Sequence, residues 1–200
     1  MTEPRVYRYV LVSDDGVAPC TDDDLLTLAT CKPVIRRKAR VGDWVVGYNP
    51  SSIGSNLVVW AGRVHEKMDP IAYEKEYRGR KDAAYRTSSN GKPERVYDYH
   101  MDDRDMAKDL SADVLIFDRA ATWYFGAEPC EPHRELTRLA PLKQRGHLVH
   151  KNSKPGDPAL LQRWLNEVSR PGIHAPPRDL GKNECHSACD VNKRINRKAC

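Results

Sequence analysis

A cluster of positive charge directly before an apolar strand constrains this chain more than any other feature. Five of the nine residues from Lys32 to Arg40 are lysine or arginine, and the turn Gly42-Asp43 leads into the apolar run that begins at Trp44. We interpret this as a basic loop attached to a buried strand, which suits binding to an anionic polymer. The alternative is a solvated charged face.

The residues before this cluster favour a binding site over a plain surface. Thr27, Thr30, Cys31 and Pro33 are small, polar or turn-forming, as expected at the rim of a pocket. We therefore predict that phosphates are held by five basic residues: Arg36, Arg37, Lys38, Arg40 and Arg145.

The length and composition are those of a folded domain. The chain has 200 residues, 40% of them hydrophobic, and a formal net charge of +5, which permits nucleic-acid binding without requiring it. No apolar run approaches the roughly 18–20 residues of a membrane span, and residues 1–20 lack a signal-peptide core, so we expect a cytoplasmic protein. We also predict that it is a monomer. We predict one α+β domain over residues 1–178 and a basic, cysteine-containing tail over 179–200.

Hydrophobic periodicity predicts the main elements. Strands are expected at 6–12, 43–48, 57–65, 113–118 and 121–126, with the second and third forming a hairpin. Asp69-Pro70, Glu131-Pro132 and Asp157-Pro158 should begin helices. The last helix has an apolar stripe of Leu160, Leu161, Trp164, Leu165 and Val168. Residues 17–32 and 78–96 are predicted as loops, the second of them mobile.

These elements predict an α+β fold with a small, strongly curved or barrel-like mixed β-sheet and a few peripheral helices. The segments 41–47 and 58–64 resemble the PUA, ASCH and EVE-type small barrels, in which a Gly-Asp turn feeds one strand and a glycine-containing strand returns beside it. That resemblance implies a cleft beside the sheet that holds an extruded base.

Several motifs are similar to the bacterial and phage nucleotide-modification-associated domain family. They are YVLVSDDGVAP, TLATCKPVIRR, VGDWVVG, DVLIF, WYFG, RGH and the helix around Trp164. Members of this family are associated with systems that make, sense or attack modified DNA bases. The resemblance implies a protein that acts on double-stranded DNA with modified bases, in particular a phage-defence glycosylase for glucosylated hydroxymethylcytosine.

An acidic and aromatic segment over residues 97–105 is the first candidate for chemistry. Enzymes that work on a base in DNA extrude it and stack it on flat side chains. We predict a base pocket formed by Thr30, Cys31, Lys32, Tyr97, Tyr99 and His100. Cleavage of an N-glycosidic bond needs a carboxylate, by analogy with sugar hydrolysis, and Asp102 and Asp103 supply candidates. The alternative is that one of them caps a helix.

Asp14 is a third candidate catalytic acid, because it follows the first strand directly and precedes a long loop. Its alternative is ordinary Asp-Asp-Gly turn chemistry. Nucleophilic catalysis is also open: neighbouring cations favour the thiolate of Cys31, and the amine of Lys32 could form a Schiff base.

The tail holds three of the six cysteines. Cys185, Cys189 and Cys200 with His186 or His174 could complete a zinc site, but the Cys-x3-Cys spacing is the weaker pattern, and we favour a basic tail that binds no metal.

The leading hypothesis is a cofactor-independent DNA glycosylase that flips out a hypermodified base, excises it and leaves an abasic site. The alternative is a non-catalytic reader of modified bases that recruits or guides a partner enzyme. A base-modifying enzyme is less favoured, since no cofactor-binding motif is visible in the sequence.

Overall fold

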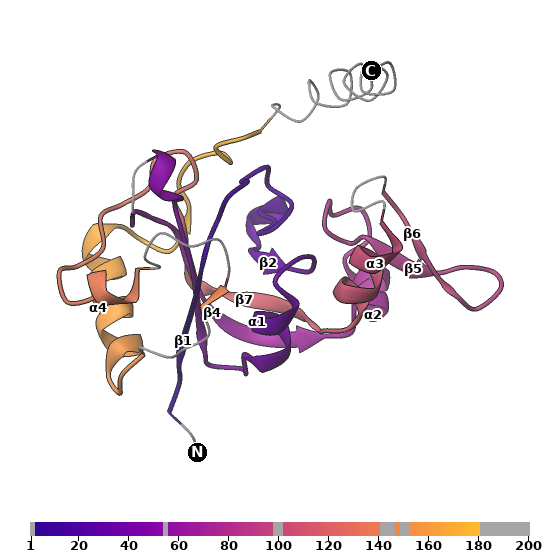
Figure 1. Cartoon of the computed structure of the whole chain (residues 1–200), viewed down its shortest axis with the longest axis horizontal. Helices are drawn as coiled ribbons and strands as arrows, with labels where there is room; N and C mark the ends of the chain where they lie inside the picture. The colour runs from indigo at the N-terminus through magenta and orange to yellow at the C-terminus, as the bar shows by residue number, and fades with distance from the viewer. Residues whose placement is uncertain (1–2, 54–55, 98–101, 141–146, 149–152, 181–200) are drawn as a thin grey trace, which may run out of the picture.

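A mixed β-sheet forms the centre of the protein (Figure 1). The computed structural model describes residues 3–53, 56–97, 102–140, 147–148 and 153–180. The seven-stranded sheet has the order β2-β7-β4-β3-β1-β8, with β9 paired to β7. Its strands are β1 (Val6–Val10), β2 (Thr27–Leu28), β3 (Trp44–Tyr48), β4 (Val58–Met68), β7 (Val114–Tyr124), β8 (His147–Leu148) and β9 (Gly172–Ile173). The pairs β1–β3 and β7–β9 are parallel and the others are antiparallel.

Short helices surround the sheet. They are α1 (Pro33–Lys38), α2 (Pro70–Glu76), α3 (Asp103–Leu110) and α4 (Asp157–Val168), with 3-10 turns η1 (Asp22–Asp24), η2 (Ser51–Ile53) and η3 (Thr137–Leu139). In Figure 1, α4 lies on the left of β1, α1 lies on its right near the edge strand β2, and α2 and α3 gather at the far right beside the β5–β6 ribbon. That ribbon consists of β5 (Tyr85–Thr87) and β6 (Pro93–Arg95).

The sheet is strongly curved, as a half-barrel, and its bulges account for the curvature. The register shifts between Gly47 and Tyr48 in β3, and twice between Gly62 and Glu66 in β4. Each bulge adds an unpaired residue and increases the local bend and twist. The predicted α+β class with a curved mixed sheet is therefore confirmed.

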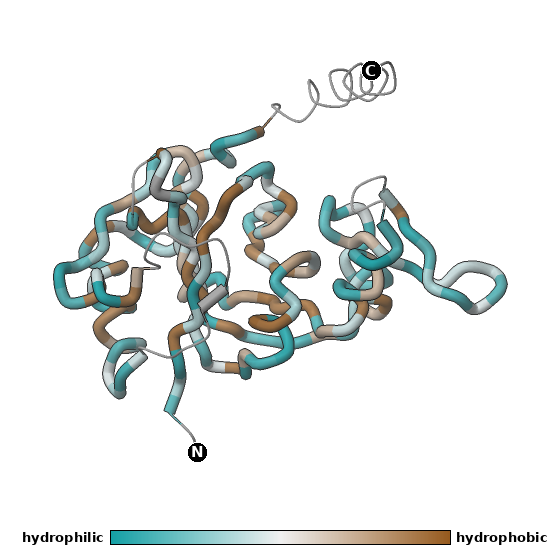
Figure 2. Tube along the Cα trace, viewed as in Figure 1, coloured by the Kyte–Doolittle hydropathy of each residue, from teal (hydrophilic) through white to brown (hydrophobic). Residues whose placement is uncertain are grey.

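Both faces of the sheet are covered, so the central strands are apolar on both sides. Val6 of β1 joins a core with Trp44, Trp123 and the buried stripe of α4, whereas Tyr7 and Tyr9 face a second core with Ile35 of α1. Figure 2 shows the apolar residues concentrated in the central segments. Successive side chains of β1 therefore point to opposite faces of the sheet and pack in different cores.

In the second core, the close packing of the Trp60 indole against Gly47 holds the side chain of Tyr9 in place. A Cβ at Gly47 would lie 2.2 Å from Nε1 of Trp60, so only glycine leaves room for this indole. Trp60 Nε1 donates a hydrogen bond of 3.1 Å to the hydroxyl of Tyr9, and the two rings meet edge to face. This locks the Tyr9 ring at the place where α1 begins.

The prediction of a mobile loop over residues 78–96 is wrong. This segment contains β5 and β6 and a buried polar network around Asp82. Asp82 accepts hydrogen bonds from the hydroxyls of Thr27, at 2.5 Å, and Tyr73, at 2.9 Å, and Arg80 donates to Tyr73 and to Thr27. These polar residues lack a hydrophobic period because they are buried as hydrogen-bonded partners.

Other boundaries also differ from the predictions. The two strands expected at 113–118 and 121–126 are one continuous strand, β7. The residues in the middle of β7 are exposed, and this interrupts the apolar pattern of the sequence. The loop predicted over 17–32 contains η1 and β2, and the helix expected at Glu131-Pro132 is replaced by η3. Val168 at the end of α4 is 41% exposed, so it does not continue the buried stripe.

Candidate functional site

The basic segment is a short helix rather than the predicted loop. Helix α1 has Pro33 at its first turn, where the missing amide proton costs nothing, and the backbone N–H of Ala39 closes its end on Ile35. Ile35 and Arg36 are buried beneath the helix, while Arg37 and Lys38 are exposed. The helix therefore divides the predicted cluster of cations into a structural part and a surface part.

A small pocket lies at the start of α1. It has a volume of about 290 Å³, and its polar lining comes from Ser13, Asp15, Thr30, Cys31 and Lys32, with apolar lining from residues 11–12, just after β1, and residues 17–18. We call it the Thr30 pocket. Three of the residues predicted to bind the base, Thr30, Cys31 and Lys32, are thus brought together.

The backbone of this pocket is held in an unfavourable conformation. Cys31 and Lys32 have φ angles of 58° and 45°, in the left-handed region that non-glycine residues seldom adopt. The N–H of Cys31 donates to the carboxylate of Asp109 at 2.7 Å, which holds the turn from α3. Strained residues of this kind cluster at functional sites, where the surrounding structure over-determines them.

Thr30 has an unused polar group at the same place. Its side chain is 1% exposed, and its hydroxyl has no hydrogen-bond partner among the described residues. Leaving a buried hydroxyl unpaired costs about 1–3 kcal/mol, so such groups usually have a partner. Thr30 lines the pocket, but the hydroxyl oxygen has almost no accessible surface, so a ligand there would bond to it only after a small shift of the surrounding atoms.

Lys32 lies against an aromatic face inside the pocket. Its Nζ is 4.7 Å from the centre of the Tyr9 ring. Burial lowers the pKa of Lys32, and the neighbouring Cys31 opposes this shift. A lysine of this kind is less strongly protonated than one on the surface.

Asp14 is buried beside the pocket but does not line it. Its carboxylate accepts hydrogen bonds from the Tyr124 hydroxyl, at 2.6 Å, and from the backbone N–H of Arg178, at 3.2 Å. Burial raises the pKa of Asp14, and these two hydrogen bonds oppose the shift. Asp14 therefore connects the turn after β1 to Arg178 and Asp179, and its catalytic role stays a prediction. The neighbouring Asp15 is the carboxylate that lines the pocket.

The predicted acids at the start of α3 have local partners. Asp102 is the N-cap residue and accepts from the backbone N–H of Arg104 at 2.8 Å; hydrogen bonds from the Arg104 side chain and backbone lower the pKa of Asp102. Asp103 is exposed and pairs with Arg95 at 3.1 Å. Neither acid lines the Thr30 pocket, so the capping alternative holds for Asp102.

The aromatic part of the predicted pocket is not assembled in the described structure. Tyr97 is partly buried and does not line the Thr30 pocket. Tyr99, His100 and the predicted phosphate ligand Arg145 lie outside the described residues.

A groove at the other end of α1 collects positive charge. It has a volume of about 560 Å³ and is lined by Tyr7 and the cations Arg5, Arg37, Lys38, Arg40 and Lys67. We call it the basic groove. None of the described residues that line it is acidic, although Lys67 also pairs with Asp113 at 3.5 Å. A concave surface with one sign of charge attracts polyanions.

The assignment of Arg36 to phosphate binding is wrong. Its side chain is fully buried, and its guanidinium donates to the carbonyls of Asp109, at 2.8 Å, of Asp113, at 3.0 Å, and of Ala112. It also lies 3.5 Å from the Asp109 carboxylate. Burial lowers the pKa of Arg36 to about 10, and Asp109 opposes this shift. Arg36 therefore binds α1 to the segment between α3 and β7.

Sequence reasoning missed Asp15 in the pocket and Arg5 and Lys67 in the groove. Asp15 adjoins the predicted acid Asp14 in the same Asp-Asp-Gly turn, and no local pattern distinguishes the two. Arg5 reaches the groove because β1 and β3 are parallel, with the N–H of Trp44 donating to the Arg5 carbonyl at 2.8 Å. No local pattern could have placed Lys67 beside them.

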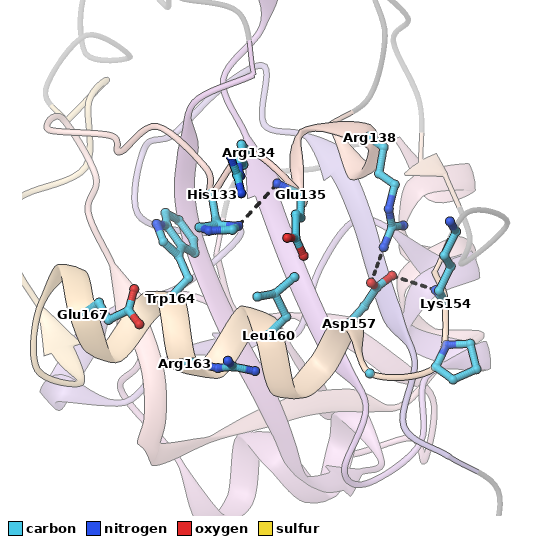
Figure 3. A pocket seen from close by; sticks show the side chains of 12 residues that line it. His133, Arg134, Glu135, Arg138, Lys154, Asp157, Leu160, Arg163, Trp164 and Glu167 are labelled. Atoms are coloured by element: carbon cyan, nitrogen blue, oxygen red, sulfur yellow. Dashed lines mark hydrogen bonds and ion pairs between the residues drawn. The ribbon is translucent and has the colours of Figure 1, made fainter.

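A larger hollow of about 820 Å³ lies between residues 133–138 and α4 (Figure 3). There Asp157 pairs with Arg138 and accepts from the backbone N–H of Lys154, at 2.6 Å. Its four cations alternate with Glu135, Asp157 and Glu167, so the hollow lacks the single sign of charge found in the basic groove.

The structure shows no prepared metal site in the part of the chain that it describes. No group of three or more potential ligands occurs there, and His174 stacks on Phe125. Cys185, Cys189, Cys200 and His186 lie outside the described residues, so the zinc alternative stays open. Among the described residues, no helix combines the length and the apolar character needed to cross a bilayer.

The fold and site define a class: a mixed α+β protein with a small polar pocket next to a polycationic groove. The chain matches the family described as nucleotide modification associated domain 2 over residues 3–111, more than half of its 200 residues. The protein therefore belongs to this family, which links it to modified nucleotides. No curated protein and no solved structure matches the chain.

The matched range separates the Thr30 pocket and the basic groove from the hollow at α4. The Thr30 pocket and the basic groove lie wholly within residues 3–111, whereas the hollow at α4 lies wholly beyond them. The motifs at 113–126 and 145–147 and the Trp164 helix, which resemble the family in sequence, also lie beyond the match. We therefore take the pocket and the groove as the candidate site.

Proposed function

We propose that this protein is a DNA glycosylase that takes a hypermodified base into the Thr30 pocket and cuts its N-glycosidic bond, in defence against phage. One observation carries the proposal: a pocket with an unsatisfied hydroxyl and a groove with five cations lie at opposite ends of the same short helix. The base pocket and the phosphate contacts that an extruded nucleotide requires would thus be built from one segment.

The distance between the Thr30 pocket and the basic groove suits the binding of an extruded nucleotide and its neighbouring phosphates. The six residues of α1 rise about 9 Å along its axis. Phosphates are charged at each nucleotide step, so cations at this distance would bind the backbone beside an extruded nucleotide. The pocket is near the lower limit of ligand pockets, roughly 300 Å³, which suits one base.

The pocket also offers polar groups for recognition and chemistry. The Thr30 hydroxyl would bond to an edge of the base, and extrusion would cost least for a base whose modification already weakens stacking. Asp15 would stabilise the oxocarbenium-like transition state or activate water. It replaces Asp14, Asp102 and Asp103 as the preferred acid, because it is the one that lines the pocket.

A non-catalytic reader is the second candidate, and the positions of the acids favour it. All three predicted catalytic acids have protein partners, and Asp15 accepts a hydrogen bond of 3.1 Å from the backbone N–H of Val17. If the Asp15 carboxylate only stabilises the turn that contains it, the pocket would bind a base without cleaving its N-glycosidic bond.

Base release separates the two functions. The purified full-length protein would be incubated with duplex DNA containing glucosylated hydroxymethylcytosine and with the same sequence containing cytosine. A glycosylase releases the modified base, detected by mass spectrometry, and leaves alkali-sensitive sites in the modified DNA alone. Asp15→Asn should lose release by at least a hundredfold, about 3 kcal/mol of transition-state stabilisation, while its DNA affinity stays similar. Preferential binding without release supports the reader, and equal binding to both DNAs without release refutes both functions.

A further inference from the structure

We propose that Lys32 is the nucleophile of the Thr30 pocket and forms a covalent Schiff base with the deoxyribose of the extruded nucleotide. This inference rests on the proposed function, in that the pocket receives a nucleotide. It adds that excision proceeds through a protein–DNA adduct rather than by direct attack of water.

The position of Lys32 sets it apart from the other lysines near the site. Its left-handed backbone at the turn before α1 places the side chain in the pocket, with Nζ over the Tyr9 ring. The Tyr9 ring is itself held by the bond from Trp60. Lys38 and Lys67, in contrast, line the open basic groove.

No carboxylate holds the amine in the described structure. None of the described acids forms an ion pair or hydrogen bond with Lys32, although Asp15 lines the same pocket. An ion-paired lysine is kept protonated and unreactive, whereas a desolvated one more readily supplies the neutral amine needed for attack. The lowered pKa of Lys32 agrees with its burial.

The reaction balances with groups that are present. The neutral Nζ forms a bond to C1′, the C1′–N bond breaks with its electron pair going to the base, and the base takes one of the two amine protons. The nitrogen lone pair then forms a C=N bond as the C1′–O4′ bond breaks, and O4′ takes the second proton. Asp15 would relay these protons and stabilise positive charge at C1′. Hydrolysis of the imine returns the amine and an abasic site.

Borohydride trapping tests this step. Hydride reduces the imine to a stable secondary amine, so a protein with such a lysine becomes permanently linked to DNA. The full-length protein would be mixed with duplex DNA carrying a preformed abasic site and sodium borohydride, and the linked residue would be identified by peptide mass spectrometry. The expected result is a covalent complex through Lys32.

Three variants make the result specific. Lys32→Arg keeps the charge and Lys32→Gln keeps a polar side chain, and both should lose the complex while their thermal unfolding stays cooperative. Lys75→Arg alters an exposed lysine of α2 outside the pocket and the groove and should trap like the parent protein. The rate of trapping should increase with pH, with a midpoint below that of a free lysine, about 10.4.

The outcomes for the two proposals can be told apart. Trapping that maps elsewhere, or that persists in both Lys32 variants, refutes the inference. Base release that continues in Lys32→Arg without trapping also refutes it and leaves the glycosylase standing. Trapping at Lys32 without release of the modified base supports the nucleophile and refutes excision of that base.

Discussion

Two neighbouring arginines of α1 should behave in opposite ways when each is replaced by alanine. Arg36 is fully buried and donates to three backbone carbonyls at the end of α3 and before β7, whereas Arg37 is exposed in the basic groove. Both lie in the same helix, so the change in helix propensity is the same. The pair therefore separates a structural cation from a binding one.

The cost of Arg36→Ala follows from the partners that it leaves. The carbonyls of Asp109, Ala112 and Asp113 lose this donor, and the Asp109 carboxylate loses its arginine while it keeps the bonds from Tyr85, at 2.9 Å, and Cys31, at 2.7 Å. Breaking a buried ion pair from one side costs about 3–5 kcal/mol. For a chain of this size, at about 2–4 °C per kcal/mol, the Tm should fall by roughly 6–20 °C.

Arg37→Ala should leave stability almost unchanged, within about 0.5 kcal/mol. It should instead reduce the slope of log affinity against log salt by about 0.9, the value for one lost phosphate contact on duplex DNA. Thermal unfolding by circular dichroism and DNA titration between low and moderate salt measure the two effects. The reasoning is refuted if Arg36→Ala keeps the Tm of the parent and reduces the salt slope as Arg37→Ala does.

Three further changes test the pocket and the predicted acids. Thr30→Val removes an unpaired buried hydroxyl, so it should raise stability by about 1 kcal/mol and weaken the preference for modified DNA; a lower Tm with unchanged preference would contradict this role. Asp102→Ala should lower the Tm slightly through loss of the α3 cap and leave base release intact, and loss of release with normal DNA binding would restore it as a catalytic candidate. Because the pKa of Asp14 is raised in the folded state, its contribution to stability is complete below the unfolded pKa of about 3.9 and declines as pH rises through the folded pKa. Asp14→Asn should therefore show a flatter decline of Tm above pH 4, and unchanged curvature would place the titration elsewhere.

Local sequence predicted those elements whose signals are complete within a few residues. The hairpin of β3 and β4 follows from two apolar runs with a turn-rich connector, and it is confirmed as an antiparallel pair. Asp69 does cap α2, and its carboxylate accepts from the N–H groups of Ile71 and Ala72. Helix α4 begins at Asp157 as predicted.

The candidate site was predicted in part. Thr30, Cys31 and Lys32 do lie together at one pocket, as expected of neighbours in one turn, and their binding of a base stays a prediction. The acid that lines this pocket was not predicted, since Asp14 and Asp15 lie in the same turn after β1 and only the folded structure shows that Asp14 is the one bonded to Tyr124. Single-sequence patterns contain no information about that choice, because both residues suit a turn equally well.

The amino-acid sequence by itself determined the curved α+β architecture, the position of positive charge around α1 and the family to which the chain belongs. These depend on hydrophobic periodicity and on motifs that are contiguous in the chain. Only the tertiary structure decided that Arg36 is buried, that Arg5 and Lys67 join Arg37 in one groove, and that Asp15 shares a pocket with Lys32. The physical reason is that burial and proximity arise from strand pairing and helix packing between distant segments, and these assign different environments to residues of the same type.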